Sequence, residues 1–255
     1  MEATVYIWVQ LDWEYVHGTV TFSMPNYMRK ALQKFQHILV GGKENSPHIC
    51  APNQYEYKIQ YADPLDAEEY LYNKETNPIQ QVCGTFLYYA IAIDNTILPA
   101  LSDISSDHSK ATKNTAKKGA KLPDYLDSYP NAEIQYRACG MQLAIHSNAS
   151  YLSVSQDRHR DSGVPFSQWR STWPKNPENF VPIVNDIILV VWKIMRNIMA
   201  SAPGAEYGTI FIDAQTDVPI CTTLNEMGWK QGPTAIQFDN STAVSISTKA
   251  FREKI

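Results

Sequence analysis

Three short segments place a polar or acidic side chain where a strand ends or a helix begins. Asn148 follows a predicted strand over 141–147, Glu206 lies in the first turns of a predicted helix, and Asp239 ends a predicted strand over 234–239. In parallel and mixed sheets, side chains at strand ends usually meet at one edge. Carboxylate oxygens gathered there bind Mg²⁺ or Mn²⁺, and a pair of such ions can hydrolyse a phosphodiester. The pattern therefore predicts a metal-binding corner.

The same three segments also have a purely structural interpretation. A carboxylate near a helix N-terminus is stabilised by the helix macrodipole, so Glu206 can serve as a capping residue. Asp239, Asn240 and Ser241 can equally be the start of a following helix. The spacing alone leaves both interpretations open.

A lysine-rich segment is the second candidate for a functional surface. Between His108 and Lys121 there are five lysines and no acidic residue. Four of them recur at spacings of three, four and four, namely Lys110, Lys113, Lys117 and Lys121. A helix predicted over 109–128 would place them on one face. That face can follow a phosphate backbone or be an ordinary solvated surface, and Gly119 weakens the helix prediction.

Composition excludes several classes of protein. The chain has 255 residues and a net charge of -4, which argues against binding nucleic acid over its whole surface. Its longest apolar run, 187–192, falls far short of the roughly 20 residues that cross a bilayer. The N-terminus is acidic, so we expect an intracellular protein, cytoplasmic or nuclear, that is neither secreted nor membrane-bound. Dinucleotide-binding and phosphate-loop motifs are absent, so no small-molecule cofactor is expected.

Periodicity predicts the elements of the first half. Residues 5–22 alternate as a β-hairpin that turns near His17–Gly18 and buries one face, and Ser23 is placed to cap a helix that ends near His37. The apolar positions of the buried face are Val5, Ile7, Val9 and Leu11. A further helix is predicted over 79–92.

The second half reads as strands followed by a helix. Strands are predicted over 133–136, 141–147 and 187–195. The helix that follows has apolar residues at helical spacing, should kink at Pro219 and should stop at Gly228. Its apolar residues are Tyr207, Ile210, Phe211, Ala214, Val218 and Cys221. The tryptophans are predicted to be core residues and groove walls; they are Trp8, Trp13, Trp169, Trp173, Trp192 and Trp229.

Longer segments resemble the C-terminal part of copia-type retrotransposon polyproteins. Residues 11–35 look like the end of the reverse-transcriptase palm and the start of its thumb, and 81–90 is similar to the helix after that thumb. The segments 146–151, 205–208 and 237–242 match the ribonuclease H motifs of that family in order. The resemblance covers nearly the whole chain.

The resemblance implies an α/β protein in two parts. Residues 1–130 would be the palm end, thumb and a connection-like α+β region, and 131–255 a truncated ribonuclease H-like domain with a mixed sheet. The family's ribonuclease H site has four carboxylates: Glu206 and Asp239 match the second and third, and Asn148 stands where the first aspartate belongs. The fourth is expected beyond Ile255, with the strand and helices that complete the fold. Mg²⁺ or Mn²⁺, an RNA–DNA hybrid and other polyprotein domains are the implied partners.

The asparagine decides what activity the resemblance implies. A unit charge about 4 Å from another contributes roughly 4 kcal/mol at an effective dielectric near 20, and about twice that against a divalent ion. An amide keeps the shape and loses most of that attraction. We therefore expect a fragment whose inherited role is hydrolysis of RNA in RNA–DNA hybrids and whose catalysis is impaired. The alternatives are a non-catalytic nucleic-acid-binding remnant and a decayed element product without a role.

Overall fold

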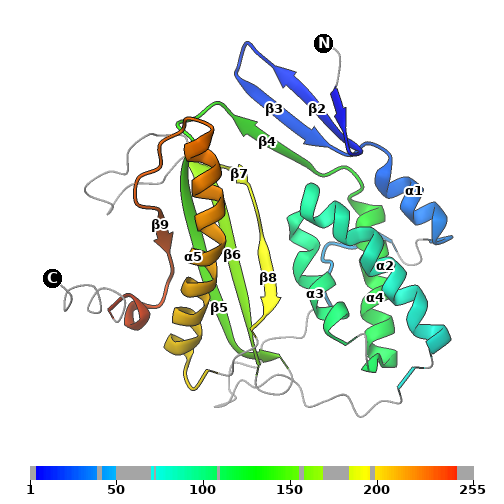
Figure 1. Cartoon of the computed structure of the whole chain (residues 1–255). Helices are drawn as coiled ribbons and strands as arrows, with labels where there is room; N and C mark the ends of the chain where they lie inside the picture. The colour runs from blue at the N-terminus through cyan, green and yellow to red at the C-terminus, as the bar shows by residue number, and fades with distance from the viewer. Residues whose placement is uncertain are drawn as a thin grey trace. The chain divides into compact units, whose positions relative to one another are not determined.

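The computed structural model describes residues 4–38, 42–49, 70–71, 73–107, 110–154, 158–168, 184–195 and 199–245. Trp169 and Trp173 lie outside these ranges. The described residues form a mixed α/β protein (Figure 1). They divide into two compact units, the first ending at Gln135 and the second beginning at Tyr136. The sequence placed this boundary between residues 130 and 131.

A small antiparallel sheet opens the first unit. It contains β1 (Thr4–Tyr6), β2 (Val9–Glu14), β3 (Thr19–Ser23) and β4 (Glu133–Arg137), in that order across the sheet. The turn at His17–Gly18 is confirmed, because β2 pairs with β3 around it. The single strand expected before it is wrong: Ile7 and Trp8 have φ angles of 48° and 69° and reverse the chain between β1 and β2.

That extra turn changes which residues are buried. Val5 and Ile7, predicted to face the core, are 65% and 58% exposed. Trp8 and Trp13 are also exposed, and so is Trp229 in the second unit, so the prediction that the tryptophans are core residues is wrong for these three. The Tyr88 hydroxyl donates a hydrogen bond to the carbonyl of Ile7, which anchors the turn.

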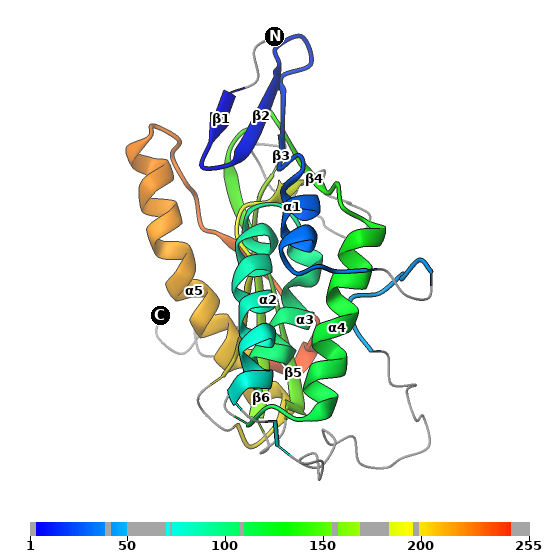
Figure 2. The same ribbon diagram turned by 90° about the vertical axis from the view of Figure 1, so that its right-hand side faces the viewer.

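Helices supply the core of the first unit. They are α1 (Tyr27–Lys34), α2 (Asn73–Ala92), the 3₁₀ helix η1 (Asn95–Ile97), α3 (Leu98–Ser106) and α4 (Lys113–Ser128). Figure 2 shows α2, α3 and α4 side by side. Their buried side chains include Phe86, Tyr89, Leu101, Ile104, Leu122 and Leu126. The predicted cap Ser23 is instead the last residue of β3, and α1 starts after Asn26, which has a φ of 63°.

Gly119 is a buried residue of α4 that faces α2. A Cβ at this position would lie 3.7 Å from a side-chain carbon of Ile79 on α2, which is an ordinary van der Waals distance. Packing therefore does not require glycine here, and α4 forms in spite of the low helix propensity of glycine.

A mixed sheet and one long helix form the second unit. The strands are β5 (Gln142–Val154), β6 (Arg158–Gln168), β7 (Val184–Ile187), β8 (Val191–Ile194) and β9 (Ala235–Gln237). Their order is β7-β6-β5-β9, and β8 also pairs with β6. All pairs are antiparallel except β5 with β9, which is parallel. The single strand predicted over 187–195 is wrong, since β7 and β8 divide it.

The long helix α5 (Ala202–Glu226) packs along β5 (Figure 1). It contains Pro219 without ending there, and Gly228, with a φ of 91°, follows its last turn as predicted. Half of the apolar stripe predicted for this helix is exposed, namely Tyr207, Phe211 and Val218, and the other half is partly buried, namely Ile210, Ala214 and Cys221. The buried residues are mostly polar: Glu206, Thr209, Asp213 and Asp217, with Ala205 and Leu224.

Candidate functional site

The parallel pair β5–β9 determines where Asp239 lies. Three residue pairs are in register, and the last of them joins His146 to Gln237, where β9 ends. Asp239 lies two residues beyond that last pair, outside the strand. Asp239 and Asn148 are both exposed.

Glu206 approaches the same edge of β5 from α5. The backbone N–H of Ala149 donates a hydrogen bond to Glu206 Oε1 at 3.3 Å. Because β9 ends at Gln237, this edge of β5 is available to a side chain rather than to a strand. Glu206 is the fifth residue of α5, beyond the first turn that the macrodipole stabilises most.

The environment of Glu206 is unfavourable for its charge. The residue is only 5% exposed, and its second oxygen, Oε2, is buried without a hydrogen-bond partner. Burial raises the pKa of Glu206, the Ala149 N–H partly offsets this, and the nearby Asp239 carboxylate raises it further. The Asp239 charge therefore repels that of Glu206, and the Oε2 atom of Glu206 has no hydrogen-bond partner.

The predicted metal-binding corner stays a prediction. Glu206 accepts from Ala149, the chain neighbour of Asn148, and the Asp239 charge acts on Glu206. Strand alternation directs the Asn148 side chain to the face of β5 opposite the buried Ser147. Glu206 reaches the edge of β5 from α5.

These residues fit one divalent cation better than two. Mg²⁺ is usually bound by one or two carboxylates, with water and substrate phosphates completing its octahedron. Glu206 and Asp239 supply two, and the orphaned Oε2 of Glu206 is a suitable ligand atom. Within the described ranges no cluster of three or more histidine, cysteine or acidic side chains is arranged to hold a metal. A pair of ions needs more anionic oxygens than these.

Two further acids of α5 escaped the sequence analysis. Asp213 and Asp217 are buried, and each has one oxygen without a hydrogen-bond partner. Burial raises the pKa of Asp213, against smaller lowering effects of the Ser147 hydroxyl and the Lys193 ammonium. The thiol of Cys221 donates to Asp217 at 3.4 Å. The available signal was spacing: Asp213 lies seven residues after Glu206 and Asp217 four after Asp213, which places all three acids on one helical face.

The predicted lysine face is only partly formed. α4 begins at Lys113 behind a capping box made by Thr112 and Thr115, so Lys110 precedes the helix and the prediction for it is wrong. Lys113 and Lys117 are exposed one turn apart. Lys121 forms an ion pair with Glu44 at 3.2 Å.

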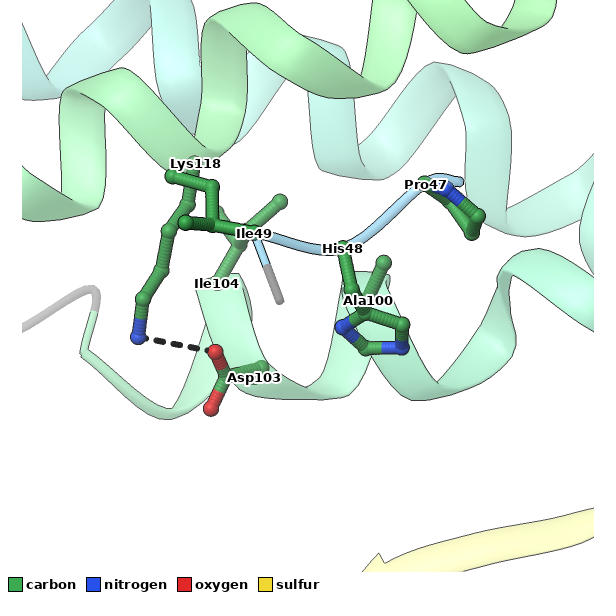
Figure 3. A pocket seen from close by; sticks show the side chains of 7 residues that line it. All are labelled: Pro47, His48, Ile49, Ala100, Asp103, Ile104 and Lys118. Atoms are coloured by element: carbon green, nitrogen blue, oxygen red, sulfur yellow. Dashed lines mark ion pairs between the residues drawn. The ribbon is translucent and has the colours of Figure 1, made fainter. Parts of the chain in front are cut away.

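A shallow hollow in the first unit holds a separate polar group. Figure 3 shows Lys118 paired with Asp103 at 2.8 Å, with His48 nearby. The hollow has a cavity volume of about 30 Å³. This is below the roughly 300–1,000 Å³ typical of ligand pockets, and none of its lining residues belongs to the metal-binding corner.

Comparisons with known proteins leave the family of this chain open. A scan of protein-family models, a search of curated proteins and a search of solved structures each find no match. Among the described helices, none has the length and apolar character needed to traverse a bilayer. The described residues thus define a mixed α/β protein in which α5 carries a buried glutamate, Glu206, against β5.

Proposed function

We propose that the second unit is the ribonuclease H-like domain of a copia-type retrotransposon reverse transcriptase. Its inherited role is hydrolysis of RNA in RNA–DNA hybrids, and its catalysis is impaired. The observation that carries the proposal is the buried Glu206, which accepts a hydrogen bond from Ala149 at the edge of β5 and has one oxygen without a hydrogen-bond partner. Glu206 and Asp239 are the two positions at which the sequence resemblance expects carboxylates.

The topology supports the same proposal. Antiparallel strands β5 to β8 are followed by α5 and then by β9, which returns parallel to β5. This arrangement gathers a strand residue, a residue early in a helix and a residue after a second strand at one edge. Gathering carboxylates from these three places is how the ribonuclease H-like fold builds its metal site.

The missing charge at Asn148 accounts for the impairment. Phosphodiester hydrolysis by two ions needs one ion for the attacking water and one for the leaving oxygen. Glu206 and Asp239 can hold one Mg²⁺ or Mn²⁺, while the Asn148 amide offers a neutral oxygen in place of an anionic one. We therefore expect weak binding of a single cation and little or no cleavage by the wild-type chain.

Cleavage of a labelled RNA–DNA hybrid in the presence of Mn²⁺ tests the proposal. Asn148→Asp should cleave the hybrid faster than the wild type does. Adding Glu206→Gln to Asn148→Asp should return cleavage to background. The double variant controls for contaminating nucleases, because it differs from the active variant only in the Glu206 carboxylate, which becomes an amide. If Asn148→Asp cleaves no hybrid, the ribonuclease H assignment is wrong.

A second candidate function is binding of nucleic acid without catalysis, favoured by the exposed Lys113 and Lys117 on α4. Each phosphate contact contributes about 0.9 to the slope of log affinity against log salt. Replacing both lysines by glutamine should lower the slope for hybrid binding by about 1–2. Lys118→Gln is the matched control, because Lys118 is paired with Asp103. Hybrid binding that does not weaken as the salt concentration rises rules this function out. A decayed product without a role would neither bind nor cleave the hybrid.

A further inference from the structure

The side chain of Gln231 behaves as an additional strand residue beside β5. Its amide nitrogen donates to the carbonyl of Met141 at 2.9 Å, and its amide oxygen accepts from the N–H of Leu143 at 3.1 Å. The same nitrogen also donates to the carbonyl of Trp229 at 2.9 Å. One carboxamide therefore joins the loop after α5 to the start of β5.

This contact lies immediately before the β5–β9 ladder. The ladder has only three pairs, from Ala144–Ala235 to His146–Gln237, and Leu143 precedes the first of them. The Gln142 side chain adds a hydrogen bond to the carbonyl of Lys230 at 3.1 Å. So short a ladder does little to fix its own register, and the neighbouring side-chain contacts supply the missing constraint.

We propose that Gln231 is a positioning residue that sets the register of β9 and thereby the place of Asp239, which follows the strand by two residues. A slip of one residue would shift β9 by about 3.3 Å along β5 and turn its side chains to the other face. Asp239 would move with the strand and change its position relative to Glu206. The inference rests on the proposed function in one respect only, which is that Glu206 and Asp239 bind a cation.

Gln231→Met tests the positioning role, since it keeps the length of the side chain and removes its hydrogen bonds. Asn185→Leu is a matched control in the same unit, on β7 at the opposite edge of the sheet. The amide of Asn185 makes an equivalent pair, accepting from the N–H of Arg137 at 2.8 Å and donating to its carbonyl at 2.9 Å. Both substitutions should lower the unfolding temperature.

The first readout is Mn²⁺ affinity, measured by titration in the Asn148→Asp background well below the unfolding temperature. Gln231→Met should weaken Mn²⁺ binding about 10-fold, the lower end of the effect of losing a residue that orients a ligand. Asn185→Leu should change it less than about 2-fold. Gln231→Glu, which keeps the acceptor for Leu143 and loses the donors, should fall between wild type and Gln231→Met. Equal weakening by Gln231→Met and Asn185→Leu overturns the inference.

The second readout needs no metal. Amide hydrogen exchange at 235–237 should accelerate in Gln231→Met, while amides of the β5–β6 ladder keep their protection. Unchanged exchange at 235–237 overturns the positioning role even if Mn²⁺ binding weakens. A failure of Asn148→Asp to bind Mn²⁺ overturns the proposed function instead, and hydrogen exchange still decides the role of Gln231. If Gln231→Met does not fold, Gln231→Glu carries both measurements.

Discussion

Glu206→Gln distinguishes a cation ligand from a helix cap. The substitution keeps an oxygen to accept from the Ala149 N–H and removes a charge that is only 5% exposed. A capping carboxylate stabilises the folded protein, so its loss is destabilising. A carboxylate held for binding, with one oxygen unpaired, destabilises the metal-free protein, so its neutralisation is stabilising.

The magnitude follows from two opposing terms. A buried polar group without a hydrogen-bond partner costs about 1–3 kcal/mol, and more when it is charged. The macrodipole stabilises a nearby carboxylate by about 0.3–1 kcal/mol and falls off after the first turn, where Glu206 no longer lies. The amide nitrogen that replaces Oε2 retains part of the burial penalty. We therefore expect Glu206→Gln to raise the free energy of unfolding by about 1–2 kcal/mol without metal.

The effect depends on pH with a definite sign. The pKa of Glu206 is raised in the folded state by burial, so the folded protein binds this proton more tightly than the unfolded chain. Stability therefore falls as pH rises from the ordinary value of 4.5 through the raised one. The gain from Glu206→Gln should be complete above the raised pKa and vanish below about pH 4.5.

Urea unfolding without metal, at about pH 8 and about pH 4, measures this gain. Hydrogen exchange of the β5–β6 ladder amides, followed alongside, assigns the change to the second unit. Glu226→Gln, at the exposed end of the same helix, is the control and should change stability by less than about 0.5 kcal/mol. Destabilisation by Glu206→Gln at the higher pH would identify Glu206 as a structural cap and refute the reasoning.

Three further substitutions test other parts of the structure. Asp213→Asn should stabilise the second unit by about 1 kcal/mol at about pH 8, because burial raises the pKa of Asp213 and disfavours its charge. It should leave Mn²⁺ affinity unchanged, because Asp213 is not part of the predicted metal-binding corner. Urea unfolding measures the stability and Mn²⁺ titration the affinity. Ile7→Asn with Trp8→Gly should raise the thermal unfolding temperature of the first unit, since left-handed backbone costs a β-branched residue about 1–3 kcal/mol and an Asn-Gly pair far less. Thr112→Ala should lower the free energy of unfolding in urea by about 1 kcal/mol through loss of the capping box.

Local chemistry made some elements predictable and hid others. The turn at Gly18 and the end of α5 before Gly228 were predictable because glycine adopts the positive φ that both places need. The turn at Ile7–Trp8 was not, since neither residue type favours it. Across that turn Val5 pairs with Gln10, so the apolar residues at odd positions of β1 and β2 lie on opposite faces.

The orientation of α5 illustrates the same limit. Helical spacing identified an apolar stripe correctly, but spacing does not state which stripe packs on the sheet. The acids Asp213 and Asp217 take the buried side, where Asp213 interacts with Ser147 and Asp217 accepts from Cys221. Only tertiary contacts decide this.

Part of the candidate site was also accessible from sequence. Glu206 and Asp239 were identified from their places at a helix start and a strand end, and the structure shows Glu206 buried against β5, with the Asp239 charge contributing to its raised pKa. The contact of Gln231 with Met141 and Leu143 spans about ninety residues and involves a side chain pairing with backbone atoms, for which the sequence carries no local signal.

The number of Mn²⁺ ions bound per chain tests the central claim most directly, because that claim concerns how many anionic oxygens the corner supplies. Equilibrium titration followed by electron paramagnetic resonance counts bound ions without requiring activity. The account predicts at most one weakly bound Mn²⁺ for the wild type, and binding at least about 10-fold tighter for Asn148→Asp, lost again when Glu206→Gln is added. Two tightly bound ions in the wild type, with affinity unchanged by Asn148→Asp, would contradict it.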